Sequence, residues 1–317
     1  MTCTLMTFSS EDTHCEAWYF EPAHDGLTTR SGCPVVVMAH GFGGTKDSGL
    51  EPFARALAGA GLAVLAFDYR GFGGSGGVPR QRISLAGQAA DYRAAMTFAA
   101  GLPGVDPGRL VLWGVSLSGG TVLEVAAGRS DVAALVALTP LVSGPAAALA
   151  GREHYETAGS LRASWQGVRS ALVRRRGRQV MMPIVGDPHE VAVLPLAGMK
   201  SDYLAIAGPT WRNAVEASIV IDVVRHRPAR HAPAVSCPAL FQVADHDRCA
   251  PPHAAMKAAV SAGALVHHYP ADHFDVYRGK PWHAKVVADQ IQFLTRVLTP
   301  TDRRQTADAV LATRTNP

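Results

Sequence analysis

Charged residues are scarce in this 317-residue chain, at 18% of the sequence, against about 25% in an average soluble protein. Hydrophobic residues make up 48%, so the chain is too apolar to remain disordered and can bury a sizeable core. The 30 Lys and Arg residues are spread along the sequence beside 26 Asp and Glu, without the clustered basic face of a nucleic-acid-binding protein. Nucleic acid is therefore not an expected partner.

Cysteine is also rare, and long hydrophobic runs are missing. The five cysteines form an odd set without a C-x-x-C pair or a zinc-type Cys/His spacing, which argues against a disulfide framework and a metal site. No apolar run approaches the about 18 residues of a membrane span, and the N-terminus lacks a basic region followed by an apolar one. We expect a protein of the reducing cytoplasm, with no membrane span and no cofactor.

Short apolar runs bounded by Gly, Pro or Asp alternate with segments of helical periodicity. Such runs are typical of strands that are covered on both faces. They predict strands at Val35–Ala39, Leu62–Phe67, Leu110–Val115, Ala134–Leu138, Ala239–Val243 and Leu265–Tyr269, and helices at Leu50–Ala60, Ile83–Ala100, Ser118–Ala127 and Pro252–Ala262. This order predicts an α/β fold with a mostly parallel, doubly wound sheet. Cys15–Phe20 is a candidate for an early antiparallel strand.

The alternation stops between Pro140 and Pro233. A structureless loop of that length is improbable inside a compact domain. We therefore predict a helical cap inserted at residues 140–233, with residues 1–139 and 234–317 forming the core domain. A pair of ordinary helices packed on the core is the alternative.

A serine follows the predicted strand Leu110–Val115 and precedes a predicted helix. A nucleophile on such a strained strand-to-helix turn requires small neighbours two residues away on either side. Gly114 and Ser118 satisfy this requirement around Ser116, although Ser118 replaces the last glycine of the usual G-x-S-x-G pattern. The alternative is a small-residue turn without chemistry.

An acid and a histidine follow in the chain order that such enzymes require. Asp245 and Asp247 both come after the strand Ala239–Val243 and could orient a histidine, with Asp247 favoured. His273 follows the strand Leu265–Tyr269, so its loop should leave the same edge of the sheet. Position in this order selects His273 from the 13 histidines of the chain.

Backbone N–H groups for a developing negative charge are predicted at two places. The first buried strand leads into the glycine-rich turn His40–Gly44, and the helix after Ser116 begins at Leu117. The N–H groups of Phe42 and Leu117 would form an oxyanion hole. Ser116, His273 and an aspartate could then form an acyl-enzyme and resolve it with water or an alcohol.

Together these stretches resemble the α/β-hydrolase superfamily over roughly residues 35–298. The motifs are AHGFGG (39–44), FDYRGFGGSGG (67–77), GVSLSGG (114–120), DHDRCAPP (245–252) and HFDVYRG (273–279). Within the superfamily the sequence is similar to a branch that contains polyketide acyltransferases and thiohydrolases. In that family the aspartate four residues before the proline of D-x-x-x-P serves the histidine, which implies Asp247, paired with Pro251, over Asp245.

The sequence thus predicts a serine hydrolase that cleaves an ester or thioester of a small acyl substrate, either free or carrier-bound. An acyltransferase that passes a polyketide-type acyl group to an alcohol is the main alternative. A catalytically silent binding protein is a further one, against which the intact Ser116, Asp247 and His273 argue. Because the nucleophile is a serine, epoxide-hydrolase and dehalogenase chemistry is disfavoured.

Several further features of the sequence allow two interpretations each. Trp165, Met181, Met182 and Trp211 are candidates for an acyl pocket or for the core of the cap. The run Arg174–Arg178 could contact a phosphate of coenzyme A or phosphopantetheine, or could be a solvated helix face. Asp68 could be a second functional acid, but a structural hydrogen-bonding role is favoured. The glycine-rich segment 71–77 lacks phosphate-loop spacing and is predicted to be a turn.

Overall fold

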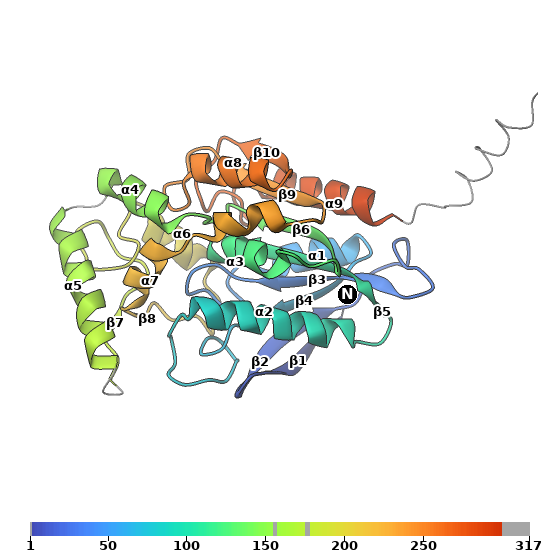
Figure 1. Cartoon of the computed structure of the whole chain (residues 1–317), viewed down its shortest axis with the longest axis horizontal. Coiled ribbons are helices and arrows are strands. Elements are labelled where there is room, and N and C mark those ends of the chain that lie inside the picture. The colour runs from blue at the N-terminus through green and yellow to red at the C-terminus, as the bar shows by residue number, and fades with distance from the viewer. Residues whose placement is uncertain (1, 155–156, 175–177, 300–317) are drawn as a thin grey trace, which may run out of the picture.

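A computed structural model of the chain describes residues 2–154, 157–174 and 178–299. Eight strands form one sheet in the order β1-β2-β4-β3-β5-β6-β9-β10 (Figure 1). Their bounds are β1 (Cys3–Ser10), β2 (Thr13–Phe20), β3 (Cys33–Ala39), β4 (Ala63–Phe67), β5 (Val105–Val115), β6 (Val132–Leu138), β9 (Ala239–Ala244) and β10 (Leu265–Tyr269). The pairs β1·β2 and β2·β4 are antiparallel and all other neighbours are parallel, which confirms the predicted sheet.

Helices cover both faces of this sheet. On one face α1 (Glu51–Gly59) contacts α9 (His283–Leu298); on the other lie α2 (Leu85–Ala100), α3 (Leu117–Ala126) and α8 (Pro252–Ser261). Every residue of β3 and β4 is buried as a result, which explains why these strands are continuous apolar runs. The connections between parallel strands carry these helices, so the carboxyl ends of β3, β5, β6, β9 and β10 share one edge of the sheet.

The predicted helical insert is present between β6 and β9. It contains α4 (Gly144–His154), α5 (Thr157–Arg174), α6 (Met199–Ile206), α7 (Ile219–Arg225) and the 3₁₀ helix η1 (Pro228–Ala234). It also contains a small antiparallel pair that the sequence did not predict, β7 (Met181–Met182) and β8 (Val215–Glu216). Figure 1 shows α4, α5, α7 and this pair gathered beyond one end of the sheet. The 3₁₀ helix contacts α3 and α8 and so joins the insert to the core.

The composition led to two expectations, one about disulfides and one about membrane spans. The five cysteines all lie in the described part, and each is a free thiol. Among the described helices, none combines the length and the apolar character needed to cross a membrane.

Candidate active site

Ser116 lies on a sharp turn between β5 and α3. Its backbone has φ 57° and ψ −118°, a strained conformation for a residue with a side chain. The neighbouring glycines make room for it, because a Cβ on Gly114 would lie 2.3 Å from the Ser118 carbonyl oxygen and a Cβ on Gly41 would lie 2.9 Å from the Ser116 Cβ. The turn is fixed by the Ser116 N–H, which donates to the Leu138 carbonyl of β6 at 2.9 Å. The strain therefore serves to project the Ser116 hydroxyl beyond the carboxyl edge of the sheet.

The hydroxyl of Ser116 is the first member of a chain of hydrogen bonds. His273 Nε2 lies 3.1 Å from Ser116 Oγ, and His273 Nδ1 lies 2.7 Å from Asp247 Oδ2. The other carboxylate oxygen of Asp247 accepts the N–H groups of Cys249 at 2.8 Å and Ala250 at 2.7 Å. The predicted Ser, His and Asp are thus brought together from the loops after β5, β10 and β9.

The competing acid, Asp245, points elsewhere. Its carboxylate lies 2.7 Å from Nδ1 of His268, at an exposed position on the edge strand β10. Of the two aspartates, only Asp247 contacts His273 in the described part of the chain.

The protonation of His273 depends on two opposing effects. Burial lowers the pKa of His273, but the charge and the hydrogen bond of Asp247, together with the charge of Asp272, raise it by more, and the net result is a pKa above the ordinary value. A histidine with a raised pKa is a stronger base, which suits a group that must take a proton from a serine hydroxyl. The carboxylate of Asp247 would also stabilise the imidazolium that such a transfer creates.

The two backbone groups predicted for an oxyanion hole belong to residues near Ser116. Phe42 lies in the turn after β3 and lines the same cavity as Ser116, while Leu117 is the first residue of α3. Neither N–H donates a hydrogen bond to another described residue, as is usual for the first N–H of a helix. Both donors are therefore available to a negatively charged oxygen beside Ser116.

The serine at position 118, where the usual motif has glycine, has a structural partner. The Tyr69 hydroxyl lies 2.6 Å from Ser118 Oγ, and Ser118 in turn donates to the carbonyl oxygen of His40. These hydrogen bonds connect the start of α3 to the start of the turn after β3. Ser118 thereby fixes the two backbone segments that carry the Phe42 and Leu117 N–H groups relative to each other. Sequence reasoning assigned no partner to Tyr69 or to Ser118.

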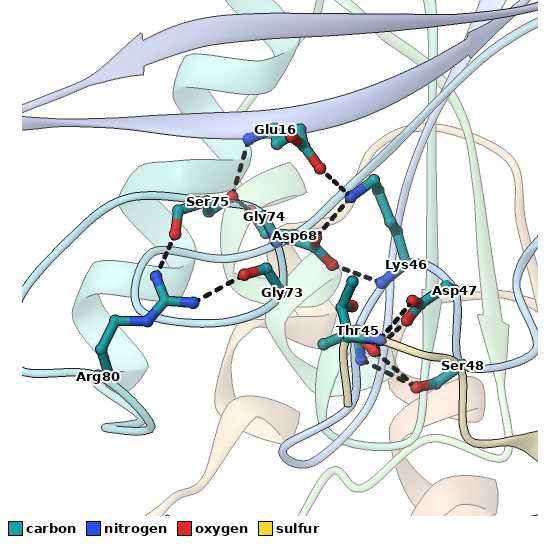
Figure 2. A network of polar contacts seen from close by, with 11 residues as sticks. Glu16, Thr45, Lys46, Asp47, Ser48, Asp68, Gly73, Gly74, Ser75 and Arg80 are labelled. Carbon is teal, nitrogen blue, oxygen red and sulfur yellow. Dashed lines mark hydrogen bonds and ion pairs between the residues drawn. The ribbon is translucent and has the colours of Figure 1, made fainter. Parts of the chain in front are cut away.

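A buried ion-pair network stabilises the segment that directly follows the turn after β3 (Figure 2). Lys46 Nζ lies 2.7 Å from Asp68 Oδ2 and 2.6 Å from Glu16 Oε1, and its side chain is only 2% exposed. Asp68 also accepts the backbone N–H of Lys46, and that of Gly74 at 3.0 Å. A Cβ at Gly73 would lie 2.1 Å from Asp68 Oδ2, so the glycine-rich segment 71–77 serves to wrap this network. Asp68 therefore has the favoured structural role and does not contact the triad.

The next residues of the turn reach the insert. Thr45 Oγ1 donates to Asp47 and lies 2.8 Å from Ser48 Oγ. The second carboxylate oxygen of Asp47 accepts the backbone N–H of Thr210 at 2.9 Å. One polar segment after β3 is thus bonded to β2, to the turn after β4 and to the insert.

We expect Lys46→Met to lower the free energy of unfolding by about 3–5 kcal/mol, because it leaves the fully buried carboxylate of Asp68 without its counter-charge. The matched control is Lys200→Met, since Lys200 also bridges two acids, Asp187 and Glu190, but at the surface. Surface pairs contribute little, so the control should unfold nearly as the wild type does. Chemical denaturation of both variants measures the difference. Equal losses would show that the buried network does not hold this turn.

Ser116 and His273 open into a cavity of about 320 Å³. Its walls are mostly small and aliphatic side chains, and many come from the insert. The insert contributes Leu141, Gly144, Ala147, Ala148, Ala163, Ser164, Ala192, Val193, Leu194, Pro195, Tyr203, Ile206, Val220, Val223 and Val224. An acyl chain held there would be largely out of water.

The four candidate pocket residues lie outside this lining. Trp165 is 63% exposed, with the Arg169 guanidinium 5.7 Å from its ring, because α5 turns Ala163 and Ser164 toward the cavity instead. Met181 is 41% exposed on β7. Met182 is buried in the hydrophobic core. Trp211 stacks on Tyr203 with ring centroids 4.9 Å apart and so contacts the cavity wall only from behind.

One further side chain lies beside the histidine. Among the described residues, Asp247, Cys249 and His273 are the three side chains whose possible metal-ligand atoms lie within 4.8 Å of one another. Burial raises the pKa of the Cys249 thiol well above its ordinary value, so this sulfur is a thiol rather than the thiolate that metals bind. Asp247 and His273 are already hydrogen-bonded to each other. The donor set therefore fits a proton relay better than a metal site.

Comparison with known proteins agrees with this geometry. The chain is a serine hydrolase of the α/β-hydrolase class. The Hydrolase_4 family model, described as serine aminopeptidase, S33, matches residues 31–271, and the chain belongs to this family. The predicted superfamily resemblance is thereby confirmed.

Three relatives cover the chain to different extents. The quorum-quenching protein AidA of Acinetobacter baumannii is 34% identical over 295 residues, 92% of this chain and 94% of that protein. The thiohydrolase aneE of Aspergillus aculeatus is 39% identical over 109 residues, 34% of each chain. The polyketide transferase grgF of a Penicillium species is 34% identical over 125 residues, 37% of this chain and 42% of that one. The crystal structure of the α/β hydrolase GrgF from Penicillium sp. sh18 covers 94% of this chain and 99% of that chain with a TM-score of 0.76 at 20% identity.

Proposed function

We propose that this protein hydrolyses an ester or thioester through an acyl-enzyme on Ser116. The observation that carries the proposal is the hydrogen-bonded series Ser116, His273 and Asp247 at the wall of an apolar cavity. A serine hydroxyl is a weak nucleophile at neutral pH and requires such a base.

In the first half-reaction, Ser116 Oγ attacks the acyl carbon while His273 Nε2 takes its proton. Negative charge develops on the acyl oxygen and is stabilised by the N–H groups of Phe42 and Leu117. When the tetrahedral intermediate collapses, the bond to the leaving alcohol or thiol breaks and His273 returns the proton to it. In the second half-reaction, His273 activates a water molecule in the same way, which releases the acid and restores Ser116.

The proposed substrate class follows from the cavity and the relatives together. The aliphatic lining favours an acyl group that is apolar near the reacting carbon. The thiohydrolase relative supports a thioester substrate, whether small or carrier-bound, and the quorum-quenching relative adds the signal molecules of quorum sensing as candidates. Esters, cyclic esters and thioesters of graded chain length are therefore the panel to screen.

The insert is proposed to act as the cap of this site. On this proposal residues 1–139 and 234–317 form the core domain and residues 140–233 the cap, with residues 300–317 lying outside the described part of the chain. Support comes from the cavity, whose lining combines Ser116 and His273 of the core with side chains of α4, α5, α6 and α7.

A bulky residue in the cap wall should shorten the acyl chain that the enzyme accepts. Ala147 on α4 lines the cavity, so Ala147→Phe should lower kcat/KM for long acyl groups by about tenfold or more while short ones are affected little. Leu149 on the same helix is 64% exposed and outside the lining, which makes Leu149→Phe the matched control. A chain-length series of p-nitrophenyl esters measures both. An unchanged profile in Ala147→Phe would remove the cavity from the proposed site.

Transfer of the acyl group to an alcohol is the second candidate, because the same acyl-enzyme can be resolved by either nucleophile. It is supported by the aliphatic cavity and by the polyketide transferase relative. We expect water to be the acceptor, so an acyl-enzyme formed from a generic thioester should decay to free acid at a rate that added alcohols leave unchanged. Quenched-flow mass spectrometry follows this decay. An acyl-enzyme that is stable in water and discharges onto one alcohol would establish a transferase instead.

A further inference from the structure

A second pocket, of about 400 Å³, lies behind α7 as seen from the proposed active site. Val220, Val223 and Val224 of α7 line the active-site cavity, whereas Asp222 and Arg225 line the second pocket. Residues at these spacings occupy opposite faces of a helix. The helix α7 is therefore a wall that the two pockets share.

The second pocket is strongly basic. Its lining contains one carboxylate, Asp222, and five guanidinium groups, those of Arg82, Arg174, Arg225, Arg227 and Arg230. The side-chain partners found for these arginines within the described ranges are not acids: Arg174 donates to Ser218 Oγ at 3.3 Å, and Arg230 Nε donates to His231 Nε2 at 3.0 Å. None of the five forms an ion pair with a described acid. Asp222 is thus the one acid among the described lining residues, and it balances at most one of the five positive charges.

Uncharged hydrogen-bond donors in this pocket would also suit an anionic ligand. The 16-residue helix α2 begins in this pocket, where Leu85 and Ala86 contribute lining and Ser84 caps the N–H of Gly87. The first N–H groups of a helix have no intrahelical acceptor and attract anions. His226 Nε2 is also buried and has no hydrogen-bond partner among the described residues. Burial, with smaller effects of Arg230 and His231, lowers the pKa of His226 to about 4, so the neutral ring can donate one hydrogen bond.

We propose that this pocket binds a phosphate or pyrophosphate group. Guanidinium groups bind phosphate oxygens through two parallel hydrogen bonds, and a helix N-terminus adds backbone donors. The group could belong to the leaving thiol of a coenzyme A or pantetheine thioester, which rests on the proposed function, or to a free phosphorylated ligand. Because α7 also lines the active-site cavity, either ligand would contact the wall of the acyl site from behind.

Binding of inorganic pyrophosphate tests the site itself. Isothermal titration at constant ionic strength should give saturable binding to the wild type and a Kd at least about tenfold weaker for the double variant Arg225→Gln/Arg227→Gln, which removes two charged donors. Both side chains are exposed, so the variant should fold, and circular dichroism checks that it does. The matched control is Arg296→Gln on α9, an exposed arginine outside the pocket, which should bind as the wild type does. Absence of saturable binding to the wild type, or equal binding to the double variant, would overturn the proposal.

Kinetics distinguish the two sources of the phosphate. If the substrate carries it, the double variant should lose about tenfold in kcat/KM on an acyl-coenzyme A, but nothing on the matched acyl N-acetylcysteamine thioester, which has no phosphate. If the two thioesters respond alike while pyrophosphate binding is lost, the ligand is a free phosphorylated molecule. Ser116→Ala separates this inference from the proposed function, because it should abolish turnover of both thioesters and leave pyrophosphate binding intact.

Discussion

Replacing Ser116 with alanine should reduce turnover by about 10³-fold or more, because members of a nucleophile and base pair act as a unit. A fluorophosphonate probe should label the wild type at Ser116 and leave the variant unlabelled. The fold should survive, since the one hydrogen bond found for the hydroxyl within the described residues is to His273 Nε2 and the turn is held by backbone hydrogen bonds of residue 116 to Leu138 and Leu141. Mass spectrometry of the labelled peptide and thermal unfolding measure both expectations.

A second serine of the same cavity provides the control. Ser164 on α5 lines the cavity and is exposed, so Ser164→Ala should be labelled and should turn over substrate nearly as the wild type does. Ser118 is unsuitable as a control, because its hydroxyl links Tyr69 to the His40 carbonyl. Labelling that persists in Ser116→Ala, or that moves to another serine, would remove Ser116 from the mechanism.

The sheet could be predicted from the sequence because its central strands are buried on both faces. Strands of this kind appear in the sequence as continuous apolar runs. The structure contains every strand that was predicted from such a run. The first strand, β1, was missed because it lies at the sheet edge, where only β2 pairs with it and most of its residues are exposed or half-buried. The last helix, α9, was also not predicted. It is amphipathic and buries only one stripe of residues, which is a weaker signal in the sequence than a continuous apolar run.

The positions of the triad were predictable for a topological reason. Parallel strands end at one edge, so residues that follow β5, β9 and β10 come together although they are far apart in the chain. Side-chain direction in the insert was not predictable in this way. Trp165 and Met181 have the right chemistry for an acyl pocket, but the rotation of α5 and the pairing of β7 with β8 turn them to the surface. These orientations depend on tertiary packing, which leaves no periodic pattern in a single sequence.

Long-range polar contacts were the least predictable feature. A lysine such as Lys46 is ordinarily expected at the surface, yet it is buried because Glu16 of β2 and Asp68 of the turn after β4 form ion pairs with it. The arginines of the basic pocket are likewise drawn from α2, α5, α7 and their flanking segments. In sequence they are scattered, so composition alone could not show that they converge.

Asp247→Asn should reduce kcat by about 10⁴-fold, whereas Asp245→Asn should leave it nearly unchanged. The structure gives the reason. Asp247 Oδ1 accepts the N–H groups of Cys249 and Ala250, so an asparagine would keep its carbonyl oxygen there and direct its NH₂ group toward His273. Facing a donor, His273 Nδ1 must be unprotonated, which puts the proton on Nε2 and leaves no base for Ser116. Asp245 pairs with the edge-strand His268 and takes no part in this chain.

The pH dependence of the same two variants provides an independent readout. The rate requires neutral His273, and its raised pKa predicts that the acid limb of kcat/KM in the wild type lies above the ordinary histidine value of about 6.5. Asp247→Asn removes the carboxylate that raises this pKa but keeps the burial that lowers it, so the limb should move to lower pH. Asp245→Asn should not move it. Initial rates measured from about pH 5 to about pH 9, a range that brackets the histidine pKa, give the acid limb of kcat/KM for each protein. If Asp245→Asn moved the limb and Asp247→Asn did not, the acid of the triad would have to be reassigned to Asp245.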